Sequence, residues 1–341
     1  MNRMNRIIEE CDSFEADYDM CCTLSGYIDQ IRQYAEVVLS DANECELCGR
    51  LIADEHVHES YSGGIYCGCC IEEAINAESP IGNYHENKGT YSFRTNGEDA
   101  PKNYRGLEIE IETGLNPEVF DVLEGYADFF VYETDGSLSE GFEAITQPMS
   151  QDYWNAVGYD MINALIFDLK SVTDDMRAWN GGNCGLHIHF NRCEWSVEAQ
   201  EFLKKFVVQN HLLLRKLCGR DDFGYCRLPN HSDYYTDDNG VIYNSSRYLA
   251  LNFTRNTIEF RLWRGTLKPE FIWASTEVSE AMLEFAEFAV SETGINLNIR
   301  PNEEDFVEFC RIRYPDVAFF KNARRQRFNS HYGDIPSENW E

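Results

Sequence analysis

The segment Gly106–Glu112, with the sequence GLEIEIE, constrains the fold of this chain more than any other. Apolar and acidic residues alternate through it without a break, which is the period-two pattern of a β-strand. One side of the strand is therefore apolar, and the other carries three glutamates spaced roughly 6–7 Å apart. Like charges at that spacing repel one another unless a cation or deep solvation compensates them. We therefore expect the rest of the fold to place a compensating group opposite Glu108, Glu110 and Glu112.

Two later segments, Leu186–Phe190 and Ile258–Trp263, alternate in the same way. Each places apolar residues against a core and ionisable residues on what we expect to be one concave surface. Hard divalent cations bind carboxylate oxygens and accept neutral imidazole as well. A guanidinium group beside such a cation indicates a phosphate or carboxylate ligand. The polar side of these two segments consists of His187, His189, Glu259, Arg261 and Trp263.

Taken singly, each segment also fits a structural role. An alternating strand that faces solvent explains the three glutamates about as well as a metal site does. His187 and His189 alone are compatible with surface positions or with hydrogen-bonded positions in a core. Three segments with the same alternation of apolar and ionisable residues together favour the metal site.

The chain has 13 cysteines. Their number is odd and the N-terminal residues lack an apolar signal core, so reduced thiols or metal ligands fit better than disulfides. Two C-x-x-C pairs joined by a glycine-containing turn are typical of a structural zinc site, with unligated thiols as the alternative. Four thiolates leave no open position for catalysis, so we expect this module to serve stability or recognition of a partner protein. The predicted ligands are Cys45, Cys48, Cys67 and Cys70, with Cys69, His56 and His58 near enough to leave the set open.

The charge of the chain disfavours several partners. Lys and Arg number 29 against 59 Asp and Glu, a formal net charge of −30. Such an acidic surface repels phosphate backbones, which argues against nucleic-acid binding. No segment approaches the ~20 consecutive apolar residues of a membrane helix, so we expect no membrane association and a cytoplasmic location.

The order of patterns predicts four parts. Residues 1–77 form a helix (about 14 to 40) and the zinc module, 78–103 a polar linker, 104–295 the main domain, and 296–341 a helical extension. Ser150 is the expected cap of a helix. In the main domain and the extension we expect strands at 128–134, 142–146, 248–254 and 257–263, helices at 150–172, 196–218, 269–291 and 303–313, and a long loop over 221–243.

Four motifs carry a resemblance to a known family. They begin at Gly106, Asp135, Cys184 and Thr257. In this order they resemble the putative amidoligase family, which is assigned to the carboxylate–amine ligase fold of glutamine synthetase and glutamate–cysteine ligase. The resemblance covers about Tyr104 to Ser291 and leaves the cysteine-rich part outside it. It implies an α+β protein with a glutamine synthetase-like antiparallel sheet and flanking helices.

The resemblance also implies two magnesium ions in the main domain. The ligands of one ion are Glu110, Asp135 and Glu143. The ligands of the other ion, which bridges the ATP phosphates, are Glu108, His187 and Glu259. Asp135 departs from the glutamate that glutamine synthetase has at the comparable place, and Glu112 has no role in this scheme.

The remaining roles concern the nucleotide and the transferred group. By the same resemblance, His189 lies near the nucleotide phosphates. Arg261 neutralises the transferred phosphoryl group or the acceptor carboxylate, with Arg247 and Arg264 as weaker candidates. The sequence has no Walker loop, so the nucleotide site depends on the resemblance and not on a phosphate-binding motif.

The implied reaction is ATP- and magnesium-dependent amide formation between a carboxylate and an amine. The γ-phosphoryl group converts the carboxylate to an acyl phosphate, and an amine then displaces phosphate. A peptide or a cell-wall component is one candidate substrate. Two alternatives are a metal-dependent hydrolase with the same acidic and histidine residues, and an inactive binding scaffold recruited through the zinc module.

Overall fold

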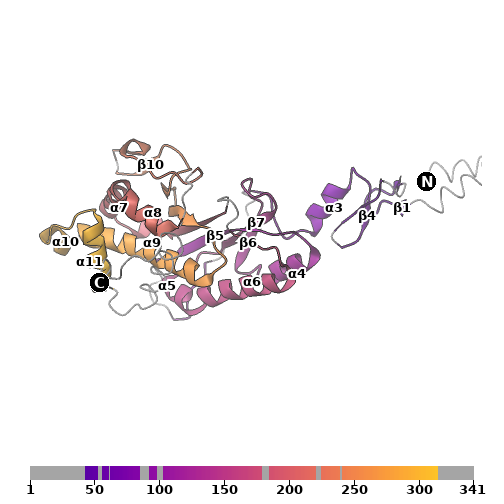
Figure 1. Cartoon of the computed structure of the whole chain (residues 1–341), viewed down its shortest axis with the longest axis horizontal. Coiled ribbons are helices and arrows are strands. Elements are labelled where there is room, and N and C mark those ends of the chain that lie inside the picture. The colour runs from indigo at the N-terminus through magenta and orange to yellow at the C-terminus, as the bar shows by residue number, and fades with distance from the viewer. Residues whose placement is uncertain are drawn as a thin grey trace, which may run out of the picture. The chain divides into compact units, whose positions relative to one another are not determined.

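The computed structural model describes residues 43–52, 56–60, 62–84, 92–97, 103–178, 184–219, 224–238 and 240–313. These residues belong to two compact units, Met1–Pro80 and Ile81–Glu341, which are taken separately below (Figure 1). The helix expected over residues 14–40 lies outside the described residues. The expected domain limits at residues 77, 103 and 295 stay predictions.

The described part of the first unit contains two short hairpins followed by a helix. Among these residues the buried apolar cluster consists of Cys45, Ile52 and Cys67, with four partly buried side chains packed around them. A cluster of this size contributes only modest stability by itself. The elements are β1 (Asn43–Glu44) paired with β2 (Leu51–Ile52), β3 (His58–Glu59) paired with β4 (Ile65–Tyr66), and α3 (Ile71–Glu78).

The described part of the second unit is built on a six-stranded sheet with the order β11-β12-β8-β5-β7-β6. Every neighbouring pair in it is antiparallel, as expected for the α+β class. All the strands predicted in this domain form, some with shorter bounds. They are β5 (Arg105–Glu112), β6 (Phe130–Glu133), β7 (Gly141–Thr146), β8 (Gly185–Asn191), β11 (Leu251–Phe253) and β12 (Thr257–Arg264).

The apolar side of the sheet packs against helices. Leu107 and Ile188 are fully buried there. On the same side, Arg105 forms two hydrogen bonds of 2.7 and 2.8 Å with Glu280 of helix α9. The helices are α4 (Pro117–Gly125), α5 (Gln151–Tyr153), α6 (Tyr159–Val172), α7 (Val197–Gln209), α8 (His211–Cys218), α9 (Pro269–Val290), α10 (Glu292–Asn296) and α11 (Glu303–Arg313) (Figure 1).

Two of the predicted helices are interrupted. The helix capped by Ser150 forms, and Ser150 Oγ accepts from the N–H of Tyr153, but a π-helical turn at Trp154–Gly158 separates α5 from α6. The helix predicted over 196–218 divides into α7 and α8 at Asn210. The side chain of Asn210 donates to the carbonyl oxygens of Phe206 at 2.7 Å and Pro301 at 3.0 Å, which stabilises the break.

Two segments predicted as irregular contain paired backbone. The loop expected over 221–243 contains the hairpin of β9 (Tyr234–Thr236) and β10 (Ile242–Asn244). Within the expected linker, isolated bridges join Gly82 to Glu133 and Phe93 to Met149. The two bridges involve partners distant in sequence, so composition alone did not indicate them.

The face assigned to Trp263 was wrong. Between Phe260 and Trp263 the register of β12 against β8 shifts, so that Trp263 pairs with Leu186 on the apolar side. Its indole N–H donates to Ser279 of α9 at 2.9 Å. The extra residue of this β-bulge breaks the strict alternation on which the prediction depended.

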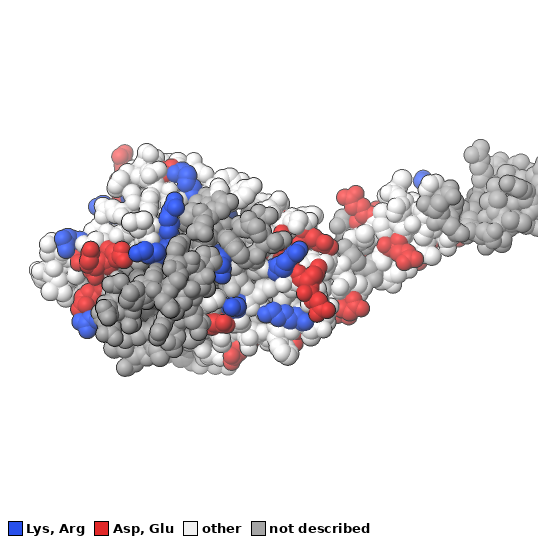
Figure 2. Space-filling model, in the orientation of Figure 1, with Lys and Arg blue, Asp and Glu red and all other residues white. Residues whose placement is uncertain are grey.

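Among the described residues, no helix has both the length and the apolar character needed to cross a membrane. On the face shown in Figure 2, acidic and basic side chains both occur among the coloured residues of the second unit. The carboxylates considered next lie on the sheet of the second unit.

Candidate functional site

The register of the sheet brings the predicted polar residues together on the side opposite α9. Glu108 of β5 pairs with His187 of β8, and Glu110 pairs with Glu143 of β7. Residues that pair across antiparallel strands point to the same face. A third pair of the same kind, between β12 and β8, is Glu259 with His189.

The two histidines lie between the carboxylates. His187 Nδ1 lies 2.8 Å from Glu108 Oε2 and 3.7 Å from Glu143 Oε1, and its Nε2 lies 3.5 Å from Glu110 Oε1. His189 Nε2 lies 3.0 Å from the other oxygen of Glu108. Glu108 therefore lies at the centre of the cluster, in contact with both imidazoles.

Two groups of potential ligand atoms emerge, each with its atoms within 4.8 Å of one another. The first group is Glu108, Glu143 and His187. The second group is Glu108, His189 and Glu259. This division of the candidate ligands into two groups differs from the one that the resemblance implies, because His189, not His187, groups with Glu259. Glu110 and Asp135 belong to neither group, and Asp135 instead accepts the N–H of Ser137 at 2.7 Å.

The burial of these side chains shapes their ionisation. Burial, together with repulsion from Glu108, Glu110 and Asp135, raises the pKa of Glu143 well above its usual range. Burial also raises the pKa of Glu110. The pKa of Glu108 shifts in the opposite direction. Burial opposes its ionisation, but the two histidines hold its pKa well below the usual value. Burial would lower the pKa of His189, yet Glu108 outweighs it and raises that pKa to about 9.

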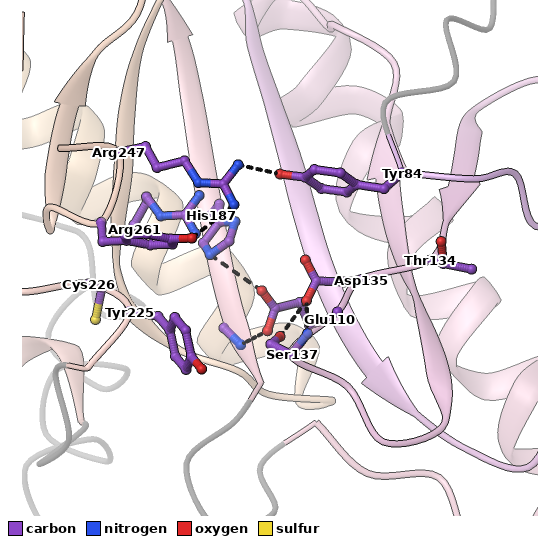
Figure 3. Close-up of a pocket in the computed structure, with 13 residues that line it drawn as sticks. Tyr84, Glu110, Thr134, Asp135, Ser137, His187, Tyr225, Cys226, Arg247 and Arg261 are labelled. Atoms are coloured by element: carbon purple, nitrogen blue, oxygen red, sulfur yellow. Dashed lines mark hydrogen bonds and ion pairs between the residues drawn. The ribbon is translucent and has the colours of Figure 1, made fainter.

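A cavity of about 550 Å³ opens over one end of this cluster. Figure 3 shows Glu110 and Asp135 on one side of it and Arg247 and Arg261 on the other, with His187 between them. Arg261 Nη1 also donates to Glu259 at 2.7 Å. The cavity thus places carboxylates opposite guanidinium groups, within the size range of small-molecule sites.

The predicted residues divide with respect to this cavity. Glu110, Asp135, His187, Arg247 and Arg261 line it. Glu108, Glu143 and Glu259 are not among its lining residues, although each contacts one that is. His189 does not line it either, and contacts Glu108 and Glu259. Arg264 is also absent from the lining, and burial lowers its pKa.

Several residues that our sequence analysis did not single out belong to the site. Tyr84, Tyr225 and Tyr248 line the cavity. Asn252, 1% exposed, pairs with Glu259 across β11 and β12 and therefore shares its face. The alternation Leu251-Asn252-Phe253 was a usable signal for Asn252, whereas the tyrosines lie in irregular segments without a periodic pattern.

Glycine at position 185 leaves room for the cluster. A Cβ atom there would lie 3.0 Å from His187 Nε2. The backbone N–H of Gly185 donates to a carboxylate oxygen of Glu110. A side chain at this position would push against the imidazole that contacts Glu108 and Glu110.

The cysteine cluster of the first unit also assembles. The sulfur atoms of Cys45, Cys48, Cys67 and Cys70 lie within 4.8 Å of one another, a grouping compatible with a zinc module. Burial opposes ionisation of Cys45, but backbone N–H groups, first that of Cys67, lower its pKa to about 6. Cys69 is exposed outside the group, with its sulfur 3.9 Å from Arg50.

Comparisons with known proteins add little. No family model matches the chain, and no curated protein matches it either. A solved structure described as "GmaS/ADP complex-Conformation 1" is similar over 70% of this chain and 70% of that chain, at 13% identity and a TM-score of 0.35. A likeness of that size does not assign a function, which has to be argued from the site.

Proposed function

We propose that the second unit is an ATP- and magnesium-dependent ligase that joins a carboxylate to an amine through an acyl phosphate. The observation that carries the proposal is the convergence of carboxylates and imidazoles from four neighbouring strands beside a cavity that also contains Arg247 and Arg261. Magnesium-dependent phosphoryl transfer needs this combination of oxygen ligands and guanidinium groups.

The donor set fits divalent cations. Both ligand groups combine two carboxylates with one imidazole, and both contain Glu108. Oxygen-rich sites of this kind suit Mg²⁺ or Mn²⁺, and the closeness of buried carboxylates leaves negative charge that a cation compensates. The residues that would hold the ions are Glu108, Glu143, His187, His189 and Glu259, with Glu110 adjacent. When bound, the cations neutralise charge on the phosphates during in-line transfer.

The guanidinium groups bind the anionic parts of the substrates. In the proposed reaction a carboxylate oxygen of the acceptor attacks the γ-phosphorus, and the bond to ADP breaks. Arg261, fixed by its 2.7 Å hydrogen bond to Glu259, is positioned to stabilise negative charge on the transferred group. Arg247 lies on the same side of the cavity and is available to bind the acceptor carboxylate or the phosphates.

The acidic side of the cavity suits the amine. The amine nitrogen attacks the acyl carbon, inorganic phosphate leaves, and one proton from nitrogen must go to a base. Asp135 lines the cavity outside both ligand groups, held by the N–H of Ser137. Its carboxylate would attract the substrate as an ammonium ion and accept the proton that leaves before nitrogen attacks, while the second proton goes to the departing phosphate. This favours a substrate that arrives as a cation over water or an alcohol, and a peptide or cell-wall amine is one candidate.

The first unit would bind one zinc ion through Cys45, Cys48, Cys67 and Cys70. Four thiolates leave no open coordination position, so the ion would supply folding energy instead of catalysis. A role in recruiting a partner protein is compatible with such a module.

The first experiment is calorimetric titration of ATP into the full chain, with and without Mg²⁺, for the wild type, Glu259→Ala and the control Glu124→Gln. Glu124 is exposed on α4 and away from the cavity. The proposal expects Mg²⁺-dependent binding that Glu259→Ala loses and Glu124→Gln keeps, followed by ADP release when acids and amines are screened. No ATP binding by the wild type would overturn the ligase and leave a hydrolase or a scaffold. Hydrolysis without nucleotide would identify the former.

A further inference from the structure

One wall of the cavity is aromatic. The rings of Tyr225 and Tyr248 meet edge to face, with centroids 5.9 Å apart and an interplanar angle of 68°. The guanidinium carbon of Arg247 lies 4.9 Å from the centroid of the Tyr248 ring. Tyr225 is 58% exposed and Tyr248 39% exposed, so much of each side chain stays open to the cavity or solvent. These three residues are called the tyrosine wall below.

The tyrosine wall is held by contacts at its edge and at its backbone. Arg247 donates to the hydroxyls of Tyr248 and Tyr84, each at 3.0 Å. The contact with Tyr84 reaches to the opposite side of the cavity, as Figure 3 shows. Behind the wall, the N–H of Arg227 donates to the carbonyl of Tyr248 at 2.8 Å. The segments that carry Tyr225 and Tyr248 are therefore joined to each other, which keeps the two rings together.

Two features of the cavity together indicate the chemistry of its ligand. At the acidic side, His187 belongs to a ligand group that would hold a cation, Glu110 lies 3.5 Å from it, and Asp135 lines the same cavity. At the other side, the exposed ring of Tyr225 offers a flat face on which any base stacks, and Tyr248, at 68° to it, would meet such a base at its edge. A ligand that matches both sides has a flat ring and several negative charges that travel with a divalent cation. A nucleoside triphosphate has both, whereas a small aliphatic acid or amine would leave the rings uncovered.

We propose that the tyrosine wall is the subsite for the nucleobase of ATP, which stacks on the ring of Tyr225 and contacts Tyr248 at its edge. The inference rests on the proposed function and adds to it the place where the base binds. Stacking does not depend on hydrogen bonds to base edges, so this wall favours a nucleotide over bare phosphates without selecting strongly among bases.

The test compares two ligands that differ in the nucleoside. Mg²⁺–ATP and Mg²⁺–tripolyphosphate are titrated calorimetrically into the full chain, for the wild type, Tyr225→Leu, Tyr248→Leu and Tyr225→Phe. Tyr235→Leu is the matched control, because Tyr235 is 60% exposed on β9 and does not line this cavity. Thermal melting of each variant checks that the fold is kept.

The expected result is a wild type that binds ATP more tightly than tripolyphosphate. Each leucine variant should bind ATP about tenfold more weakly, with tripolyphosphate unchanged. Tyr225→Phe and Tyr235→Leu should keep wild-type affinity for both ligands, because the first retains the ring and the second is remote.

Three outcomes would overturn the subsite alone. The first is equal wild-type affinity for ATP and tripolyphosphate. The second is leucine variants that leave ATP binding unchanged, and the third is leucine variants that weaken the binding of both ligands equally. If neither ligand binds the wild type in Mg²⁺, the nucleotide-dependent function itself fails and the subsite with it. The comparison between ATP and tripolyphosphate thus separates the two failures.

Discussion

The side-chain amide of Asn252 donates to Glu259 Oε2 at 3.1 Å, while Arg261 donates to the other oxygen at 2.7 Å. The two hydrogen bonds therefore fix the orientation of this carboxylate. The same amide nitrogen also donates to the backbone carbonyls of Arg247 at 2.8 Å and Leu249 at 3.3 Å. Asn252 thus joins the carboxylate of a candidate ligand group to the segment that carries the tyrosine wall.

Replacing the amide of Asn252 by a carboxylate should strongly destabilise the protein. In Asn252→Asp, an oxygen takes the place of a nitrogen that faces Glu259 and two carbonyl oxygens, within a residue that is 1% exposed. We expect the free energy of unfolding to fall by about 3 kcal/mol and the affinity for Mn²⁺ to drop. Denaturant unfolding and Mn²⁺ titration by electron paramagnetic resonance measure the two effects. A variant as stable as the wild type would show that these hydrogen bonds do not form as described.

Glu143→Gln should separate stability from metal binding. Without metal, the buried Glu143 carboxylate is repelled by Glu108 and Glu110, so the neutral amide should raise the free energy of unfolding by about 1 kcal/mol. The same change removes a candidate ligand of one of the two ligand groups, so the variant should gain less stability than the wild type when Mn²⁺ is added. Thermal melts with and without Mn²⁺ check both effects, against Glu124→Gln as the surface control. Metal-induced stabilisation equal to that of the wild type would remove Glu143 from the ligand set.

Cysteine variants should define the zinc ligands. Cys45→Ser should lose bound zinc and destabilise the first unit, because it removes one of four clustered sulfur atoms. Cys69→Ser should keep one zinc ion per chain, because that sulfur lies outside the cluster beside Arg50. Mass spectrometry of bound metal after purification measures the stoichiometry. Zinc loss in Cys69→Ser with retention in Cys45→Ser would reverse the assignment.

Acid stability should depend on Asp233. Arg227 donates to both of its oxygens at 2.6 and 2.7 Å and holds its pKa well below the usual value, although burial opposes this. A lowered folded-state pKa stabilises the fold above the unfolded-state pKa, about 3.9, and this contribution is lost as the pH falls toward the folded-state pKa.

Asp233→Asn should therefore cost about 1–2 kcal/mol at neutral pH and flatten the acid limb of the stability curve. Denaturant unfolding between pH 2 and 7 tests this, with the exposed Asp121→Asn as control. An unchanged acid limb in Asp233→Asn would contradict the role of this ion pair.

Much of the second unit could be predicted from local patterns. Alternation in Gly106–Glu112 and Leu186–Phe190 placed their glutamates and histidines on one face, and the sheet confirms that face. The cap at Ser150 also formed, because an N-cap depends on neighbours three residues away. The partition of the histidines did not follow from pattern, because it depends on how far the side chains of β12 and β7 reach across β8 and β5.

The sequence by itself determined which residues carry charge and which side of each strand they occupy, because period-two alternation is a property of the backbone. It also indicated the four cysteines that cluster, while Cys69, His56 and His58 stayed open as alternatives. Only the tertiary structure decided the strand order, the bulge that turns Trp263 toward Ser279, and the placing of Tyr84 and Tyr225 beside the cavity. Those features arise from contacts between residues far apart in the chain, and no local pattern encodes such contacts.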